Sequence, residues 1–303
     1  MTASSAFRCS VAAELRGDPM MGTAPPQTRV LLVHQPGAWG PRGLTESRCD
    51  PEVARRIDAA AAKAGMRLQA IRRPGKHEPG IPAGGYEVGI AETNVDTPRI
   101  TWWRVEDLAA IAPELEAGWP RLTPDAVDTV PLYLVCAHGK HDACCALRGR
   151  PIAQALQRLR PGRVWETTHL GGDRFAPNVL VLPAGELYGR VPAEIVPELT
   201  RCADAGEVIP ELLRGQIGLK PAAQAALIFV RQQLGIVART ALKVTSLRWV
   251  DDDHAEVRVT GPQGALTVAV ETEIRSAAQL TCRGPENVRA RVYRGTTIST
   301  YSR

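Results

Sequence analysis

The sequence predicts an α/β fold with an internal repeat, followed by a region of a different kind. Three observations carry this prediction. Short apolar runs typical of strands alternate with helical segments, their order in residues 28–122 recurs in residues 128–206, and the last hundred residues contain mainly alternating strands. The chain has 303 residues and is 44% hydrophobic, so it is long enough for two or three packed domains and too apolar for disorder.

The first repeat follows a lead-in segment, residues 1–27, that mixes small residues, glycine and proline without a strand period. Asp50 followed by Pro51 favours the start of a helix, and Gly65 favours its end. A loop rich in proline and glycine is expected at 74–85. The expected elements are a strand at 29–34, a helix at 50–63, strands at 66–72, 86–91 and 99–105, and a helix at 106–111.

The same order returns after a turn-rich stretch at 120–128. The expected elements are a strand at 130–135, a helix at 143–159, a strand at 164–168, a hairpin of 178–182 with 186–191, and a helix at 192–205. A β-α-β unit followed by a β-hairpin and a helix is the skeleton of a thioredoxin-like domain. We therefore expect two tandem thioredoxin-like domains, at residues 28–122 and 128–206.

Residues 207–303 are expected to form a C-terminal α+β region. Its predicted elements are a helix at 221–234 and strands at 243–250, 255–260 and 265–271. The acidic run at 251–253 is interpreted as a solvated hairpin turn.

Composition and charge exclude several classes of protein. The net charge is +5, but the arginines are dispersed and do not cluster with aromatic residues, so no nucleic-acid partner is expected. The apolar runs are far shorter than the roughly 20 residues that span a bilayer, so no membrane partner is expected. The N-terminus does not resemble an export signal, which predicts a cytoplasmic protein. Seven cysteines, an odd number, favour thiols or metal ligands over a disulfide framework.

Potential metal ligands and their neighbours are concentrated in two segments that each follow a predicted strand. The first contains Cys136, His138, His141, Asp142, Cys144 and Cys145, and the second contains His169, Gly171, Gly172, Asp173 and Arg174. The glycines let the backbone fold closely around an inorganic group. Because the two strands are expected to be neighbours, the segments should meet and bring together Cys136, Cys145, His169 and Asp173.

These segments resemble the sucrase/ferredoxin-like family. The resemblance rests on Cys136-Ala-His-Gly with Cys145, on His169-Leu-Gly-Gly with Arg174-Phe, and on Asn178, Pro183, Gly185 and Tyr188-Gly-Arg. It implies a thioredoxin-like ferredoxin domain whose [2Fe-2S] cluster has two cysteine ligands nine residues apart and two histidine ligands four apart. On this resemblance the ligands are Cys136, Cys145 and His169, and the position of the second histidine is occupied by Asp173.

Asp173 leaves three possibilities open, because a carboxylate is a harder and rarer cluster ligand than imidazole. It ligates one iron, a nearby donor such as Cys144 or His141 replaces it, or the site has lost its cluster. His138, Asp142, Gly171, Gly172 and Arg174 are expected to surround the ligands. The resemblance implies an electron carrier that docks with a redox partner protein. No motif in the sequence identifies this partner, and none indicates the oligomeric state.

The same residues are also compatible with other functions. Cys136, His138, His141 and either Cys144 or Cys145 can form a compact zinc site. A reactive cysteine at the start of a helix would suit a thiol redox enzyme, although no Cys-x-x-Cys motif occurs. A cofactor-free interaction protein is a third alternative. Glycoside hydrolysis is not expected, because no acidic pair stands in a recognisable catalytic context. Cys9, Cys49, Cys202 and Cys282 are interpreted as small buried apolar residues.

Overall fold

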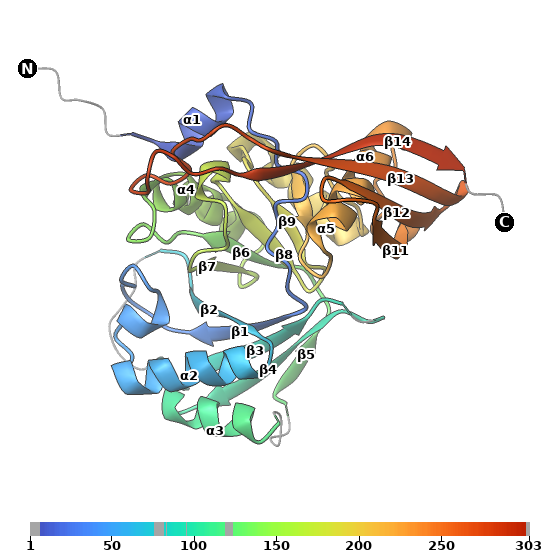
Figure 1. Cartoon of the computed structure of the whole chain (residues 1–303). Helices are drawn as coiled ribbons and strands as arrows, with labels where there is room; N and C mark the ends of the chain where they lie inside the picture. Colours follow the sequence, from blue (N-terminus) through green and yellow to red (C-terminus); the bar gives the residue numbers. More distant parts are fainter. Residues whose placement is uncertain (1–6, 76–81, 83, 95, 119–123, 301–303) are drawn as a thin grey trace, which may run out of the picture.

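The computed structural model describes residues 7–75, 82, 84–94, 96–118 and 124–300, and its central element is a ten-stranded mixed sheet (Figure 1). The sheet runs in the order β10-β9-β8-β6-β7-β2-β1-β3-β4-β5. Its strands are β1 (Arg29–His34), β2 (Arg67–Arg72), β3 (Tyr86–Glu92), β4 (Arg99–Val105), β5 (Ala126–Asp128), β6 (Leu132–Cys136), β7 (Val164–Thr167), β8 (Val179–Leu182), β9 (Glu186–Tyr188) and β10 (Leu213–Gln216).

The two halves of this sheet have the same arrangement of strands. In the first half β1 is parallel to β2 and antiparallel to β3, and β3 is antiparallel to β4. In the second half β6 is parallel to β7 and antiparallel to β8, and β8 is antiparallel to β9. Antiparallel pairing of β2 with β7, at Ile71 with Thr167 and Arg72 with Glu166, joins the halves into one sheet.

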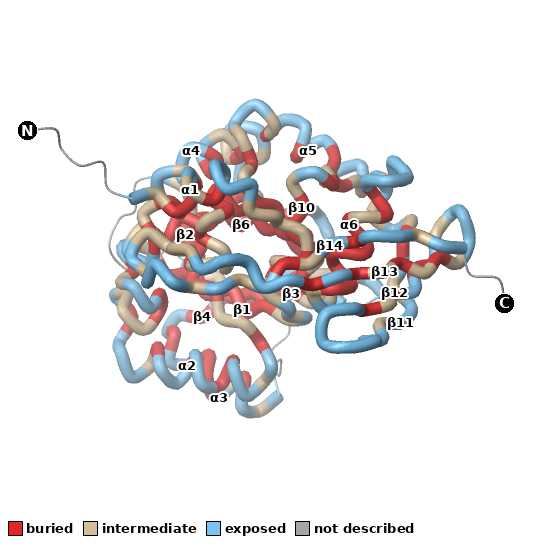
Figure 2. Tube along the Cα trace, turned by 45° about the horizontal axis from the view of Figure 1, so that its top comes forward, coloured by how far each residue is buried: buried red, intermediate tan, exposed pale blue. Residues whose placement is uncertain are grey.

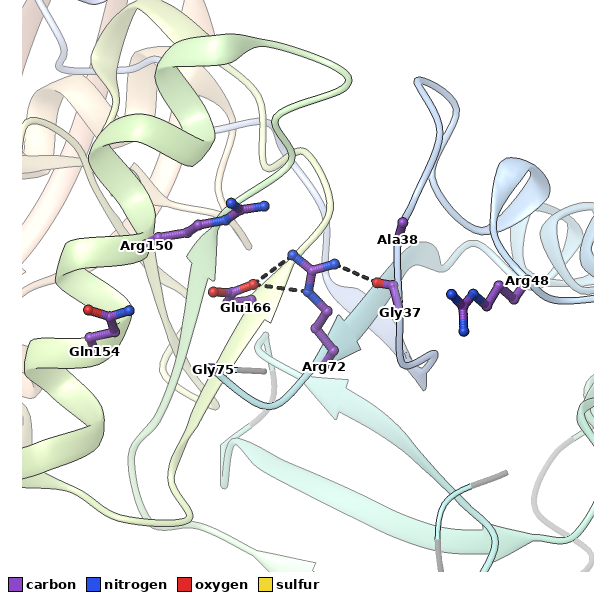
Figure 3. Close-up of a pocket in the computed structure, with 8 residues that line it drawn as sticks. All are labelled: Gly37, Ala38, Arg48, Arg72, Gly75, Arg150, Gln154 and Glu166. Atoms are coloured by element: carbon purple, nitrogen blue, oxygen red, sulfur yellow. Dashed lines mark hydrogen bonds and ion pairs between the residues drawn. The ribbon is translucent and has the colours of Figure 1, made fainter. Parts of the chain in front are cut away.

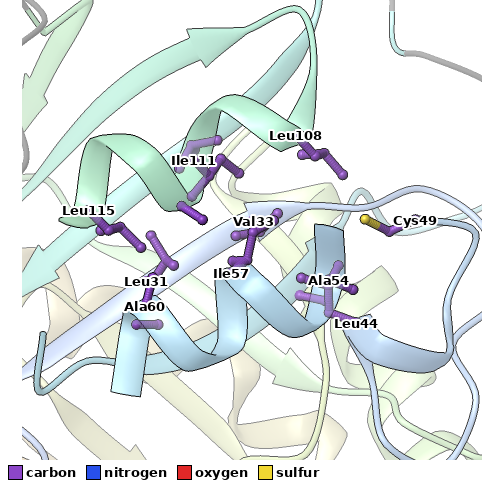
Figure 4. Packing of buried hydrophobic residues seen from close by; sticks show 14 of the residues in the cluster. Leu31, Val33, Leu44, Cys49, Ala54, Ile57, Ala60, Leu108, Ile111 and Leu115 are labelled. Atoms are coloured by element: carbon purple, nitrogen blue, oxygen red, sulfur yellow. The ribbon is translucent and has the colours of Figure 1, made fainter. Parts of the chain in front are cut away.

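Four helices cover the outer face of the sheet. In the first half these are α2 (Pro51–Lys63) and α3 (Ile111–Glu116), and in the second α4 (Ala143–Leu159) and α5 (Val196–Ala205) (Figure 1). Helix α2 begins where expected, because the Asp50 side chain accepts hydrogen bonds from two backbone N–H groups of its first turn. Figure 4 shows how Leu31 and Val33 of β1 pack against Ile57, Ala60 and Ile111 of the two helices.

The strand residues that point away from these four helices form a second core, on the inner face of the sheet. Successive side chains of a strand point to opposite faces, so Val30 and Leu32 lie away from α2 and α3. They belong to one buried cluster with Leu134 of β6 and Trp165 of β7, which come from the other half. The sheet is therefore curled, and its two halves share an inner core, seen as the buried centre of the molecule in Figure 2. Cys136 and Cys145 belong to this cluster.

Helix α6 (Pro221–Leu234) packs against a separate four-stranded antiparallel sheet. The strands are β11 (Lys243–Trp249), β12 (His254–Gly261), β13 (Gly264–Ile274) and β14 (Arg291–Thr300). The buried residues of β12 and β13 alternate along each strand, as one-sided burial requires. Residues 275–290, which we call the strap, connect β13 to β14. The strap reaches across the molecule to helices α1 (Cys9–Leu15) and α4 (Figure 1).

The sequence located most elements to within one or two residues and missed others. The helix expected at 106–111 was wrong. The Asp107 side chain caps a 3-10 turn at Leu108–Ala110, one residue after the expected start, and α3 begins only after this turn. Helix α1 lies within the lead-in segment, and β10 adds a strand to the large sheet by covering the edge of β9. Strand β14 was not expected. The loop at 74–85 and the stretch at 120–128 lie partly outside the described residues.

The repeated strand order agrees with the internal repeat, and the mixed α/β class is confirmed. The expected domain boundaries, at residues 27, 122, 128 and 206, stay a prediction. Among the described residues, no helix is both long enough and apolar enough to cross a membrane.

Candidate metal centre

Two parallel strands place the predicted donor segments side by side. Cys136 is the last residue of β6 and pairs in register with Thr167, the last residue of β7. Parallel neighbours end at the same edge of a sheet. The chain that leaves Cys136 and the chain that leaves Thr167 toward His169 therefore start next to each other, as the sequence predicted.

Helix α4 brings Cys145 against Cys136. The helix begins at Ala143, and its first turn is capped by the Asp142 carboxylate, which accepts the Cys144 N–H at 2.8 Å. Gly149 permits a close approach of helix to strand, because a Cβ atom there would lie 2.0 Å from the carbonyl oxygen of Cys136. As a result Cys136 and Cys145 are both buried, with exposed fractions of 1% and 0%.

The loop after β7 turns through two glycines that other residues could not replace. Gly171 and Gly172 have φ angles of +90° and +72°, in the left-handed region. A Cβ atom on Gly172 would lie 2.4 Å from a guanidinium nitrogen of Arg214, and one on Gly171 would lie 2.6 Å from Pro25. This tight path leads into the 3-10 helix Asp173–Phe175 and turns Asp173 inward, where it is 4% exposed.

Four potential ligands meet at this point. The ligand atoms of Cys136, Cys145 and His169 all lie within 4.8 Å of one another. The Oδ1 atom of Asp173 lies 3.1 Å from the Cys145 sulfur and 2.8 Å from His169 Nδ1. That nitrogen is buried and makes no aligned hydrogen bond with any residue that the structure describes. His169 Nδ1 is therefore close to the carboxylate and the thiols but is not aligned with them for an ordinary hydrogen bond.

The electrostatics of the site favour one thiolate and a charged imidazole. The hydrogen bond from Cys145 lowers the pKa of Cys136, and His169 lowers it further against the effect of burial, while the same bond and burial raise the pKa of Cys145. Burial opposes a charged imidazole, but Asp173 and Cys136 outweigh it and raise the pKa of His169 to about 9. Burial likewise opposes a charged Asp173, yet His169 holds the pKa of this carboxyl below its ordinary value.

Three histidines form a stack beside these donors. The rings of His141 and His169 stack with centroids 4.0 Å apart, and the ring of His138 also stacks with that of His141, at 5.5 Å. His141 Nε2 lies 3.7 Å from Asp173 Oδ2, so His141 is close enough to be an alternate ligand, as the sequence analysis allowed. His138 is held by Gly40, whose carbonyl oxygen lies 2.7 Å from its Nε2, and by the His169 N–H at 3.3 Å from its Nδ1.

Other expected neighbours face elsewhere. Cys144 points away from Cys136, toward Cys9 and Cys282, and Asp142 points the same way. Arg174 pairs with Asp18, with 3.4 Å between Nε and Oδ2, and its guanidinium lies over the ring of Phe175. The compact zinc site built with His138 and Cys144 is therefore not assembled in this structure.

Two arginines that the sequence did not indicate donate hydrogen bonds to the loop that carries His169 and Asp173. Arg67 donates to the carbonyl oxygen of His169 at 2.8 Å. Arg214 is 1% exposed and donates to the Gly171 carbonyl oxygen and the Asn178 side chain, both at 2.7 Å. Both place positive charge next to a group of thiolate and carboxylate ligands. A buried arginine in β10, a strand that the sequence did not predict, had no signal by which it could be found.

An open pocket of about 550 Å³ lies where β2 and β7 join the two halves of the large sheet. Figure 3 shows the ion pair of Arg72 with Glu166 at its base, with Arg150 on helix α4 to one side and Arg48 to the other. Arg72 also donates to the carbonyl oxygen of Gly37, which fixes the loop that follows β1. Arg48, Arg72 and Arg150 give the pocket positive charge, and the residues that line it lie outside both donor segments.

The donor set fits a metal or a cluster of soft character, since two thiols and an imidazole are ligands of zinc and iron–sulfur sites. Asp173, at the position where the resemblance implies the second histidine, lies with the other three residues. The family model described as sucrase/ferredoxin-like matches residues 20–215, which include all four of these residues and more than half of the chain. No curated protein and no solved structure matches the chain.

Proposed function

The chain belongs to the sucrase/ferredoxin-like family, and from this premise we propose that it is an electron-transfer protein that holds a [2Fe-2S] cluster through Cys136, Cys145, His169 and Asp173. One observation carries the proposal. Two buried thiols, an imidazole and a carboxylate converge at the ends of two parallel strands, in the spacing that the family's ligands have. A bound cluster of this type supplies a one-electron redox couple.

The residues around the ligands suit such a group. Gly171 and Gly172 let the backbone approach closely, and Arg67 and Arg214 offset negative charge with their guanidinium groups. The thiols are buried, whereas the side chains of His169 and His141 are 24% and 36% exposed. The histidine side of the site is therefore the side that solvent and a redox partner protein can reach.

His169 also gives this site a group that can hold a proton. A histidine that ligates a metal through one ring nitrogen can take up or release a proton at the other, and the His169 side chain is 24% exposed. We propose that this outer nitrogen of His169 is the proton-accepting group, and that it couples electron transfer to pH.

Zinc binding is the second candidate, and one observation favours it. The three ligand atoms of Cys136, Cys145 and His169 lie within 4.8 Å of one another, which is compatible with a single tetrahedral ion, and Asp173 would complete a set of four. In that case the protein would not carry electrons, because zinc has no redox chemistry.

The repeated strand order supports the finer description of the large sheet as two tandem thioredoxin-like domains. In each half the order is β2-β1-β3-β4 or its equivalent β7-β6-β8-β9, with a helix after the first strand. We propose that only the second of these domains binds the cluster, because β1 ends in His34 where β6 ends in Cys136. A cytoplasmic location remains part of this proposal.

Metal analysis tests the proposed function. The full chain is purified without oxygen, and iron, acid-labile sulfide and zinc are quantified. We expect about two irons and two sulfides per chain, a strong loss of both in Cys136→Ala, and no loss in Cys49→Ala. Cys49 is a suitable control because it is a buried thiol in the core cluster of the first half and belongs to none of the groups of potential metal ligands. Stoichiometric zinc at these residues without sulfide would establish the second candidate instead.

A further inference from the structure

A second cluster of potential metal ligands lies on a different face of helix α4 from Cys145. Its members are Cys9 of helix α1, Cys144 of helix α4, Cys282 of the strap, and Asp142, the residue that caps α4. Cys9 and Cys144 are almost completely buried, and Cys282 is partly buried beside them. Three segments that are far apart in the sequence therefore contribute one sulfur atom each to the same place.

The spacing of the sulfur atoms matches ligands around one ion. The Cys144 and Cys282 sulfurs are 3.4 Å apart, and those of Cys282 and Cys9 are 3.7 Å apart. Two thiolates bound at about 2.3 Å to one tetrahedral zinc ion lie about 3.8 Å apart, whereas a disulfide bond is about 2.05 Å long. The sulfurs are thus too far apart for a disulfide and close to the separation of ligands on one metal.

Asp142 completes the set. Both oxygens of its carboxylate lie 3.6 Å from the Cys9 sulfur, and the expected separation of a thiolate and a carboxylate oxygen on one zinc ion is about 3.5 Å. Each oxygen is also fixed by a backbone N–H group, one from Cys144 at 2.8 Å and one from Cys282 at 2.6 Å. The N-terminal end of α4 places partial positive charge beside Cys144, which stabilises its thiolate.

The strap needs such an attachment. None of residues 275–290 is buried, so the strap has no hydrophobic core to hold it against the rest of the protein. The hydrogen bonds that join its two arms lie within the strap, between Ala278 and Val288 and between Arg275 and Ala290, and its Cys282 N–H donates to Asp142. Its tip, at Cys282, nevertheless lies against α1 and α4, at the end remote from the four-stranded sheet (Figure 1).

We propose that Cys9, Cys144, Cys282 and Asp142 bind one structural zinc ion, which fastens helix α1 and the strap to the start of helix α4. The ligand set closes the coordination sphere of the ion, as structural rather than catalytic zinc sites do. The site is separate from the four ligands of the proposed cluster, although Cys144 and Cys145 are adjacent in the chain. It holds the helix whose first turn presents Cys145.

Zinc quantitation of the full chain and of two variants tests this proposal. Wild-type protein is expected to contain about one zinc ion per chain at this site, Cys202→Ser is expected to keep it, and Cys282→Ser is expected to lose it. Cys202 is the matched control, a thiol of α5 outside the cluster. Hydrogen exchange should show that residues 275–290 and helix α1 exchange faster after the loss. If Cys282→Ser fails to fold, Asp142→Asn and a zinc-depleted wild-type protein titrated with Co²⁺ provide the test, because thiolate–Co²⁺ absorption is expected only in an intact site.

Two results would overturn the proposal. One is a Cys144–Cys282 disulfide, or three free thiols without metal, found by mass spectrometry of protein purified without oxygen. The other is zinc that Cys136→Ala loses and Cys282→Ser keeps, because that zinc would belong to the other site. Loss of iron from Cys136→Ala with retention of this zinc supports both proposals, and absence of iron from wild-type protein bears only on the proposed function.

Discussion

Cys144 and Cys145 are consecutive residues of helix α4, yet their sulfur atoms lie in two different clusters. Cys145 donates to Asp173 at 3.1 Å and contacts Cys136, whereas the Cys144 sulfur lies 3.4 Å from that of Cys282. Consecutive residues of an α-helix point about 100° apart, so one turn of α4 serves two groups of ligands. The sequence alone allowed either cysteine to be the partner of Cys136.

This relationship gives the first prediction. Cys145→Ala is expected to lose iron and sulfide and to keep one zinc ion, and Cys144→Ala is expected to lose the zinc and to keep most of the iron. The two variants change the same residue type in the same turn, so each is the control for the other. Simultaneous determination of iron, sulfide and zinc in both proteins checks the prediction. Equal effects of both substitutions on both metals would contradict the separation of the sites.

The second prediction concerns the reduction potential. An oxidised cluster core of about +2, with two thiolates and two neutral histidines, has a net charge near zero, whereas a carboxylate in place of one histidine leaves about −1. A more negative site accepts an electron less readily. We therefore expect Asp173→His to raise the potential in a spectroelectrochemical titration. Its matched control is Asp18→Asn, which removes an acid that pairs with Arg174 outside the donor set; a lower potential in Asp173→His would contradict the ligand role of Asp173.

The third prediction is a pH dependence of the metal-free protein. The pKa of His169 is raised from 6.5 to about 9, because Asp173 and Cys136 outweigh the effect of burial. A histidine with a raised pKa in the folded state contributes stability that is complete below about pH 6.5 and is lost as the pH rises through about 9. Asp173→Asn should bring the NMR titration of His169 toward lower pH and flatten this fall in unfolding free energy. A His169 titration that is unchanged in Asp173→Asn would show that the pair does not form.

The fourth prediction concerns the junction of the two halves of the large sheet. Arg72 of β2 and Glu166 of β7 form an ion pair with side chains 6% and 4% exposed, and Arg72 also stacks on Trp39. Removing one partner leaves a buried charge alone, so Glu166→Gln is expected to lower the free energy of unfolding by about 3–5 kcal/mol. Glu256→Gln breaks the exposed pair with Arg248 and should cost less than about 1 kcal/mol. Urea unfolding of both variants measures the difference, and equal costs would contradict it.

Much of the fold and half of the site were predictable because they depend on local sequence. Asp50 and Pro51 define the start of α2, and Asp142 defines that of α4. The convergence of Cys136 with His169 follows from a parallel pair of strands, which a β-α-β pattern predicts. The family resemblance added the correspondence of Asp173 with a ligand position.

The remaining features depend on contacts between distant segments. Cys282 lies 273 residues from Cys9, and no local pattern indicates that the strap carries it across the molecule. The interpretation of Cys9 as a small buried apolar residue is confirmed, but it did not indicate that the sulfur atoms of Cys9 and Cys282 lie together. Arg214 was missed because β10 has only four residues, and its place beside β9 depends on the edge left open by the large sheet.

The most direct test of the central claim is EPR spectroscopy of the anaerobically purified protein after reduction. If Cys136, Cys145, His169 and Asp173 hold a [2Fe-2S] cluster, the reduced protein gives a spin-½ signal, and pulsed measurements detect strong coupling to the nitrogen of one imidazole that ¹⁵N-histidine labelling identifies. Asp173→His should add coupling to a second imidazole. A reduced protein without such a signal, or a signal without imidazole coupling, would contradict the proposed ligand set.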